Sequence, residues 1–345
     1  MVGKETKSDS DLEFWRLIKP FKIHTSKIML ISVIIPSYNR PDLISYTIDS
    51  ILSQTVDADI EIIIGDDCSN EATRAVLLDF KGRYPEVIHL IFHERNIGLG
   101  ANWATCVKAC KGDFICNCDN DDYWHNPNKL QIQLDYMTSH LQTNVLFTGY
   151  RTHNRKTGRI KEYKTYINRE IPLQQAFWAG DFKVCNASIM YRADFLKRYL
   201  PLDDFISYHF SLQDWPTWII LSAYTDFDVI EESTTTFGID TTSITRPKSV
   251  KVLKCRMDKD LKCYKYCCNM FPQMKKYVKT EWNTYENKVL LAASYRTNDF
   301  ENAHYYSGLL RDKRTIKILA AKSRITFFIY SSMLKMKRII YNGGS

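Results

Sequence analysis

Short runs of β-branched and other apolar residues alternate along this chain with longer stretches in which apolar residues recur every three or four positions. The runs lie at residues 31–35, 60–64, 87–92 and 114–118. The stretches between them lie at residues 42–54, 71–83 and 99–110. A run this short is typical of a buried strand, whereas the longer spacing is typical of an amphipathic helix. Strands and helices that alternate with short connections predict an α/β fold with a largely parallel central sheet flanked by helices.

The alternation continues less regularly to about residue 247. We expect further strands over 144–150, 187–191 and 227–231, and further helices over 129–139, 192–200 and 213–224. The segment 151–183 has no clear periodicity and is expected to be a loop or an excursion from the core. The pattern divides the chain into a polar leader (1–28), an α/β domain (29–247) and a basic helical C-terminal region (248–345).

The composition of the 345 residues narrows the class of protein. Hydrophobic residues make up 45% and charged residues 25% of the chain, which excludes collagen-like, low-complexity and disordered proteins. A membrane-spanning helix is not expected, because no uncharged apolar run approaches the required length of about 18 residues. Residues 1–28 lack the apolar core of a secretory signal. The ten cysteines are expected to be reduced thiols in a cytosolic protein.

Polar residues gather where the predicted parallel strands end, which is where ligands bind in open sheets of this kind. After the first strand come Pro36, Ser37, Tyr38 and Asn39. The proline fixes a turn, the tyrosine ring could lie against a nucleotide base, and the two polar side chains could donate hydrogen bonds to it. A plain turn between a strand and a capped helix is the alternative explanation.

The second strand ends in two adjacent acids, Asp66 and Asp67. Neighbouring carboxylates at the end of an apolar strand repel each other and lose hydration, so a compensating group is expected beside them. One of these acids could accept hydrogen bonds from a base edge or a ribose. Capping of the next helix by Asp67, Ser69 or Asn70 explains the same residues equally well.

Three carboxylates follow the fourth strand within four residues, at Asp119, Asp121 and Asp122. Mg²⁺ and Mn²⁺ prefer oxygen ligands and are commonly held by one or two carboxylates together with substrate phosphates. The cluster therefore predicts a site for a metal ion and a nucleotide, with a solvated acidic turn as the alternative. A calcium-binding loop is excluded, because the Gly at its sixth position and the Glu at its twelfth are missing.

These motifs together resemble family 2 glycosyltransferases, which have the GT-A fold and act in bacterial polysaccharide and lipopolysaccharide synthesis. The resemblance covers residues 31–232, and its pieces occur in the family's order. They are SVIIPSYNR (32–40), SILSQT (50–55), EIIIGDDCSN (61–70), NIGLGANWA (96–104), KGDFICNCDNDD (111–122) and QDWPTW (213–218). The C-terminal region carries no motif of the family.

The resemblance implies a donor site for a sugar nucleotide, usually a UDP-sugar. It places Pro36, Ser37, Tyr38, Asn39, Asp67, Asn102 and Asp119 around the nucleotide. Asp67 would hydrogen-bond to the base, and Asn102 would lie close to the ribose and the diphosphate. The Mn²⁺ or Mg²⁺ ion would be held by Asp121 and Asp119, with Asp122 as a further candidate ligand.

The resemblance also implies the reaction. Asp214 matches the family's general base, although Gln213 stands where a Glu is commoner. It would take the proton from a hydroxyl of a glycan or lipid-linked acceptor, and that hydroxyl would displace the nucleotide with inversion at the anomeric carbon. The residues expected to meet the acceptor are Asn186, Ser188 and Trp215.

Two other functions match parts of the sequence. A Mg²⁺-dependent phosphatase of the haloacid dehalogenase type also places acids at strand ends, but its nucleophilic Asp would follow the first strand, where this chain has Pro36, Ser37 and Tyr38. A nucleic-acid-binding protein would use the basic C-terminal region. Motifs that read bases are missing and the rest of the chain is acidic, so no nucleic-acid partner is expected.

The C-terminal region differs in charge from the rest of the chain. Residues 250–345 contain 20 Lys and Arg against 7 Asp and Glu, whereas the remaining residues contain 27 against 32. In 311–338, basic residues interrupt the apolar runs too often for a membrane span. The pattern suits a helix on an anionic surface, such as the cytoplasmic face of the inner membrane, where the protein would meet a lipid-linked acceptor. A helical bundle packed against the core is the alternative.

Overall fold

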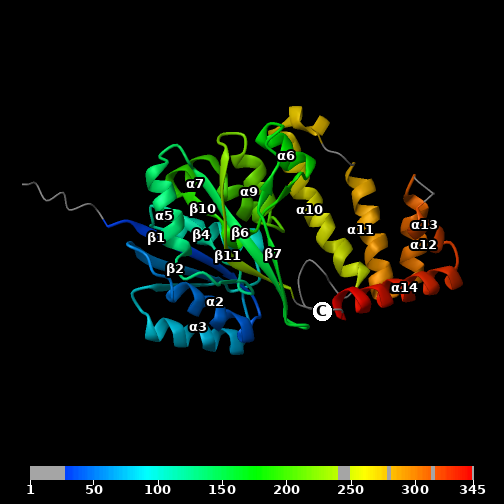
Figure 1. Cartoon of the computed structure of the whole chain (residues 1–345), viewed down its shortest axis with the longest axis horizontal. Helices are drawn as coiled ribbons and strands as arrows, with labels where there is room; N and C mark the ends of the chain where they lie inside the picture. The colour runs from blue at the N-terminus through cyan, green and yellow to red at the C-terminus, as the bar shows by residue number, and fades with distance from the viewer. Residues whose placement is uncertain (1–27, 240–248, 278–280, 312–314, 344–345) are drawn as a thin grey trace, which may run out of the picture.

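The computed structural model describes residues 28–239, 249–277, 281–311 and 315–343. Figure 1 shows a central sheet with helices on both of its faces, and a group of C-terminal helices, yellow to red, on one side of it. The expected leader over 1–28 falls almost entirely outside the described residues, and so does the expected boundary at residue 247. Both therefore stay predictions.

The first part of the sheet is parallel, as the alternating pattern predicts. Its strands are β1 (Leu30–Ser37), β2 (Asp59–Asp66), β3 (Ile88–Phe92) and β4 (Phe114–Asn117). They lie in the order β3-β2-β1-β4, and every neighbouring pair is parallel. Because β1 is central and buried on both faces, its sequence is an almost continuous apolar run.

The second part of the sheet is mixed. It contains β5 (Tyr123–Trp124), β6 (Val145–Asn154), β7 (Arg159–Tyr163), β10 (Met190–Arg192) and β11 (Phe227–Ile239). The sheet continues from β4 in the order β10-β6-β11-β5, and β7 also pairs with β6. Strand β10 is antiparallel to both β4 and β6, whereas β6 and β11 are parallel. The two parallel strands β6 and β11 therefore end at the same edge of the sheet as β1, β2 and β4.

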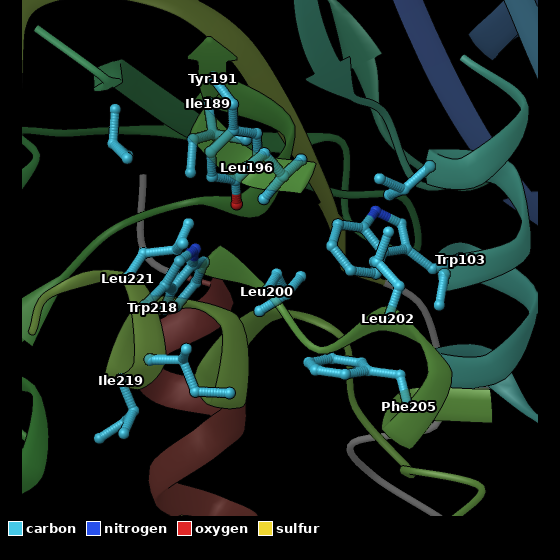
Figure 2. Packing of buried hydrophobic residues seen from close by; sticks show 14 of the residues in the cluster. Trp103, Ile189, Tyr191, Leu196, Leu200, Leu202, Phe205, Trp218, Ile219 and Leu221 are labelled. Carbon is cyan, nitrogen blue, oxygen red and sulfur yellow. The ribbon is translucent and has the colours of Figure 1, made fainter. Parts of the chain in front are cut away.

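Helices cover the two faces through separate apolar clusters. One face packs against α2 (Pro41–Leu52), α3 (Glu71–Arg83) and α5 (Lys129–Ser139). The other packs against α4 (Leu99–Ala109), α6 (Leu173–Ala179), α7 (Ala193–Tyr199), α8 (Leu202–Ser207) and α9 (Asp214–Leu221). Figure 2 shows this second cluster, in which Trp103 of α4 lies beside Phe205 of α8 with 5.9 Å between the ring centroids. This packing holds α4 and α9 next to the strands whose ends carry the acidic residues.

The segment 151–183 corrects the sequence prediction, because it is not an unstructured excursion. Strand β6 continues to Asn154 and turns into β7, and β8 (Tyr166–Ile167) pairs with β9 (Phe182–Lys183) on either side of α6. Strand β7 is mostly exposed, so no apolar alternation marks it in the sequence. The strand expected over 187–191 begins only at Met190, because Asn186–Ser188 form a 3-10 turn.

The C-terminal region is helical where it is described, as expected. Its elements are α10 (Val250–Met270), the 3-10 helix η2 (Pro272–Tyr277), α11 (Trp282–Thr297), α12 (Phe300–Leu309), α13 (Ile316–Ala320) and α14 (Arg324–Gly343). The last four helices share an apolar cluster around Leu290, Ala303 and Phe327 with the first half of α10. Helix α10 also packs against α9 of the α/β part. None of the helices in the described part of the chain is both long and apolar enough to span a bilayer.

The ten cysteines are all free thiols, which confirms that they form no disulfide framework. Eight of them are buried, for example Cys116 and Cys118 beside the acidic turn. Burial raises the pKa of the Cys116 thiol to about 11, so this thiol stays protonated and inert.

Candidate active site

The ends of the parallel strands bring the predicted motifs to one edge of the sheet. Ser37 at the end of β1 pairs with Asp66 at the end of β2, and β4 lies on the other side of β1. The turn after β4, residues 119–122, therefore lies beside the turn after β1. A long contact of 3.5 Å from Asn120 Nδ2 to Ser37 Oγ joins the two turns.

Two side-chain amides donate hydrogen bonds to the carboxylate of Asp119 in the acidic turn. Its Oδ1 accepts a hydrogen bond from Gln213 Nε2 at 3.1 Å, and its Oδ2 accepts one from Asn186 Nδ2 at 3.3 Å. Burial, followed by the charge of Asp121, raises the pKa of Asp119 to about 7. The fold thus brings residues from three distant segments together around one carboxylate.

A chain of buried amides lies behind Asp119. Asn117 donates from Nδ2 to Asn186 Oδ1 at 3.0 Å and accepts at Oδ1 from Trp103 Nε1 at 3.0 Å. Because both polar ends of each amide are used, their orientations are fixed and Asn186 must turn its NH₂ group to Asp119. The sequence analysis missed Asn117, although a polar side chain within the apolar run FICNC was a usable signal.

Asp122 turns away from Asp119 and toward β11. Its Oδ1 accepts a hydrogen bond of 2.8 Å from the backbone N–H of Gly238. Its Oδ2 is buried and has no hydrogen-bond partner among the described residues. Burial and the charges of Asp121 and Asp119 raise the pKa of Asp122 well above its usual range. Asp122 therefore anchors the acidic turn to β11, and its role as a metal ligand stays a prediction.

Arg155 and Gly238 hold the acidic turn from the β6 and β11 side. Arg155 Nη2 donates to the backbone oxygen of Asp121 at 2.6 Å. A Cβ atom at Gly238 would lie 2.3 Å from that oxygen and 2.4 Å from Arg155 Nη1, so glycine is required for this close approach. Neither residue was predicted, because no local pattern shows that β6 and β11 reach the turn after β4.

Asp121 presents the most accessible carboxylate of the three. About a quarter of its side chain is exposed, and its Oδ2 lies 4.0 Å from the guanidinium of Arg40. Arg40 stands at the start of α2, so its charge reaches the acidic turn from the turn after β1. This arrangement leaves Asp121 in contact with solvent at the edge of the sheet.

The donor set of the acidic turn suits a divalent cation that takes its other ligands from a phosphate. No group of three or more His, Cys, Asp or Glu side chains converges on one point within the described ranges. A site made by the protein alone is therefore not formed. The charge of Asp121 raises the pKa of Asp119, however, and Asp122 has a buried Oδ2 without a hydrogen-bond partner among the described residues. A cation bridging one or two of these carboxylates to a diphosphate would relieve both conditions.

The residues expected to line a nucleotide base lie at the end of β1 and directly after it, and their contact with a base stays a prediction. Pro36 and Ser37 are buried, whereas Tyr38 is 46% exposed. Asn39 has a positive φ of 50°, and its Oδ1 accepts a hydrogen bond of 2.8 Å from the backbone of Asn70. This side chain therefore ties the turn after β1 to the turn after β2 and leaves the Tyr38 ring at the surface.

The turn after β2 shows the helix capping that was offered as one explanation of its sequence. Asn70 is the N-cap of α3, and its Oδ1 accepts from the backbone of Thr73 at 3.0 Å. Arg74 supplies the compensating charge, with Nε 2.8 Å from Asp66 Oδ2. The carboxylate of Asp67 accepts from the backbone N–H groups of Ile97 at 2.6 Å and Gly98 at 3.0 Å. Asp67 therefore orders the 96–98 turn, and its contact with a base stays a prediction.

Asn102 is buried beneath the end of β2. Its side chain is buried, Nδ2 donates to the backbone oxygen of Gly65 at 2.8 Å, and Oδ1 lies 3.0 Å from His93 Nε2. These contacts fix α4 to the end of β2. Its expected closeness to a ribose and diphosphate stays untested.

Asp214 is the first residue of α9 and lies within electrostatic reach of Asp119. Its Oδ1 accepts from the backbone N–H of Trp215 at 2.6 Å. Burial raises the pKa of Asp214, and the charge of Arg256 on α10 opposes that shift. The C-terminal region thus contributes charge to the surroundings of the candidate base, which the sequence motifs did not indicate.

The three candidate acceptor residues are placed differently. Asn186 contacts Asp119, as described above. Ser188 is fully buried and donates to the backbone oxygen of Cys185 at 2.8 Å, which places it inside the core. Trp215 is partly exposed, and its ring centroid lies 6.0 Å from Trp178 and 6.4 Å from Tyr264. Asn186 and Trp215 therefore remain the candidates at the site.

Comparisons with known proteins identify the family and the fold of the chain. A family model described as glycosyl transferase family 2 matches residues 32–200. The uncharacterized protein Rv1520 of Mycobacterium tuberculosis is 31% identical over 161 residues, which are 47% of this chain and 46% of that protein. WfgD of Escherichia coli, a UDP-Glc:alpha-D-GlcNAc-diphosphoundecaprenol beta-1,3-glucosyltransferase, is 37% identical over 118 residues, 34% of this chain and 44% of its own. The matches thus span less than half the length of these relatives.

A solved structure shows the same fold. The mannosyltransferase PcManGT from Pyrobaculum calidifontis, in complex with GDP-Man and Mn²⁺, superposes with a TM-score of 0.50 at 14% identity, covering 93% of each chain. The GT-A fold expected from the sequence is therefore confirmed. Through residues 32–200, the chain belongs to glycosyl transferase family 2.

Proposed function

We propose that this protein transfers a sugar from a nucleotide diphosphate donor to a hydroxyl of a glycan or lipid-linked acceptor. The observation that carries the proposal is the convergence of Asp119, Asn186 and Gln213 at the carboxyl edge of the sheet, next to Asp214. The resemblance assigns Asp119 to the donor and Asp214 to the acceptor. The donor and the acceptor would therefore meet at this one group of residues.

The donor would lie across the ends of β1, β2 and β4. The exposed ring of Tyr38 offers a stacking surface for the base, and the turn that Asp67 orders lies beside it. Asp121 and Asp119 would hold a Mn²⁺ or Mg²⁺ ion, with Asp122 as a further ligand. That ion would stabilise the negative charge that develops on the departing diphosphate. Arg40 would add a fixed positive charge on the nucleotide side of Asp121.

Asp214 would act as the general base. In its ionised form it would accept the proton of an acceptor hydroxyl at Oδ2, because Oδ1 is held by the backbone N–H of Trp215. Burial raises the pKa of Asp214, which makes the carboxylate a stronger base than an exposed aspartate. Attack from this side, opposite the nucleotide, would invert the anomeric configuration.

A UDP-sugar is the donor we propose. WfgD is named for a UDP-Glc donor and a lipid-linked diphosphate acceptor, and the more distant PcManGT is described with GDP-Man and Mn²⁺. The similarity to WfgD covers 34% of this chain and 44% of WfgD, and we take from it the class of donor alone. A cytoplasmic protein in peripheral contact with an anionic membrane is the setting that a lipid-linked acceptor requires.

Thermal melting with nucleotides tests the donor half of the proposal. We expect UDP with Mn²⁺ to raise Tm, and UDP alone or Mn²⁺ alone to have much smaller effects, because ligands that bind the native state stabilise it by mass action. GDP, ADP and CDP with Mn²⁺ serve as controls for the base. Indifference of Tm to every nucleotide, with and without metal, would contradict the proposal.

The transfer half is tested by UDP release. UDP-Glc and UDP-GlcNAc are incubated with the full chain and Mn²⁺, with and without a lipid extract or glycan acceptors. Acceptor-dependent release of UDP supports a transferase. Release of phosphate from nucleotides at the same rate without any acceptor would instead favour the phosphatase alternative.

A further inference from the structure

The outer surface of α13 and α14 carries large apolar side chains that are exposed and lie outside the apolar core. Ile325 is 74% exposed and Ile329 is 57% exposed. The members of this α13–α14 surface are Ile316, Leu319, Ile325, Phe328, Ile329 and Met333, each at least 43% exposed. Those on α14 recur every three or four residues and so share one face of the helix. A contiguous exposed apolar face of this kind marks an interaction site.

The opposite face of α14 is already packed, so the outward residues are not misplaced core. Phe327 is fully buried, and its ring stacks on Tyr295 of α11 with 4.8 Å between the centroids. Ser331 Oγ donates to the backbone oxygen of Tyr295 at 3.2 Å. Figure 1 shows α14 lying across the ends of α11 and its neighbours, away from the central sheet. The inner face of α14 therefore packs into the C-terminal helical bundle. The exposed apolar side chains on its outer face require a separate explanation.

The charges around the α13–α14 surface indicate the chemistry of the partner that it would bind. Lys317, Lys322 and Arg324 are exposed beside the apolar residues, and the sequence from 315 to 334 contains no Asp or Glu. Arg324 also pairs with Glu301 of α12 at 2.7 Å. Apolar side chains interspersed with cations are complementary to a bilayer that carries anionic head groups.

We propose that the α13–α14 surface binds the headgroup region of an anionic phospholipid bilayer. Phe328, Ile329 and Ile325 would enter the boundary between head groups and acyl chains, and Lys317 and Lys322 would contact the lipid phosphates. A second copy of the chain is a poorer occupant, because symmetric pairing of this face would bring the like charges of two basic helices together. The inference deepens the proposed function and rests on it for its purpose, which is to bring the site to a lipid-linked acceptor.

Vesicle sedimentation with the full chain tests the inference. Vesicles of phosphatidylcholine are compared with vesicles in which about 30% of the lipid is phosphatidylglycerol. We expect binding to the anionic vesicles that weakens as salt is raised, and little binding to the neutral ones. Equal binding to both kinds of vesicle, or to neither, would overturn the inference.

Matched variants test whether vesicle binding depends on the α13–α14 surface or on exposed basic and apolar side chains anywhere on the protein. Neutralising one cation near such a surface costs about fivefold in partitioning, so Lys317→Gln with Lys322→Gln should weaken binding about 25-fold. Phe328→Ser with Ile329→Ser should weaken it by about tenfold or more. The controls are Lys262→Gln with Lys265→Gln on α10, and Leu78→Ser with Leu141→Ser, which are also exposed. Unchanged binding by the surface variants, or equal losses in the controls, would contradict the assignment.

Two further measurements keep the outcomes distinct. All variants are at exposed positions, and circular dichroism melts check that they fold like the wild type. Sedimentation velocity without lipid tests the alternative occupant, because a dimer that dissociates in the Phe328→Ser, Ile329→Ser variant would assign this face to self-association and overturn the proposal. Vesicle binding needs no sugar nucleotide, so its failure would leave nucleotide binding and UDP release unaffected.

Discussion

The side-chain amide of Gln213 donates to Oδ1 of Asp119 across 94 positions of sequence, at a distance of 3.1 Å. A Glu, which is commoner at this place in the family, would face Asp119 with a second carboxylate instead of a donor. The contact therefore explains how this chain lowers the charge around its acidic turn. It also shows that the residue before the candidate base contacts the acidic turn.

Gln213→Glu should make the protein depend more strongly on metal for its stability. The new carboxylate loses the hydrogen bond to Asp119 and repels it in a buried setting, so Tm without metal should fall by on the order of 5 °C. Addition of Mn²⁺ and UDP should recover most of that loss. Thermal melting with and without the ligands measures both effects.

Gln213→Met is the matched control for this prediction, because it removes the hydrogen bond without adding charge. It should also lower Tm, but Mn²⁺ with UDP should not restore it selectively. If Gln213→Glu and Gln213→Met respond identically to the metal, charge at this position is unimportant.

Asp119 should make the metal-free protein less stable as pH rises. Its pKa is near 3.8 in the unfolded chain and is raised to about 7 by burial and by Asp121 in the folded one. Between these values the folded state binds more protons than the unfolded state, so the free energy of unfolding falls with increasing pH. Tm measured without metal should therefore decrease from about pH 5 to about pH 7.5.

Asp119→Asn should flatten this pH dependence, since the variant has no carboxyl group to titrate at that position. Asp226→Asn, an exposed change after the far end of α9, should leave the slope as in the wild type. A slope that persists in Asp119→Asn would assign the titration to other groups of the turn.

Asp214→Asn should abolish transfer and leave nucleotide binding intact. Removing a general base typically costs about 10²–10⁴-fold in rate, whereas the contacts expected for the nucleotide lie on β1, β2 and β4. UDP release in the presence of acceptor measures the first effect, and the rise in Tm with UDP and Mn²⁺ measures the second. Normal transfer by Asp214→Asn would remove it from the role of base, and Asp226→Asn serves again as the control.

The sequence was sufficient to predict the strands and helices that carry a regular local pattern of apolar residues. Strands β1, β2 and β4 and helices α3 and α4 lie where apolar runs and helical spacing place them, because each buries a regular set of side chains. The hairpin of β6 and β7 was missed for the opposite reason. Strand β7 is stabilised by hydrogen bonds to β6 and exposes most of its side chains, so its sequence carries no period.

Residues of the candidate site were predictable where the residue type itself indicates the chemistry. They were not predictable where their role depends on contacts between distant segments of the chain. The acids at 119–122 stood out by their position after a strand, and Asp214 was implied by the family resemblance. Asn117, Arg155 and Arg256 did not stand out, because each acts through a contact between segments far apart in the chain. Ser188 illustrates the converse, since a polar residue at the expected position lies with its side chain buried in the core.

Arg155 should be required for tight metal and nucleotide binding although it follows β6, outside every predicted motif. Its Nη2 holds the backbone oxygen of Asp121 at 2.6 Å, and its charge lies close enough to Asp122 to oppose the rise in that residue's pKa. Arg155→Met removes both effects and leaves the acidic turn anchored mainly through Gly238. We expect affinity for UDP in the presence of Mn²⁺ to fall about tenfold, measured by calorimetric titration.

Arg155→Lys restores the charge without the geometry of the guanidinium and should recover only part of the affinity. Lys156→Met, an exposed change at the next residue, should bind like the wild type. The melting temperature without ligands separates a loss of binding from a loss of folding. A tenfold loss in Arg155→Met at unchanged Tm would show that the β6–β7 hairpin orients the acidic turn, whereas wild-type affinity in that variant would reduce the contact to packing.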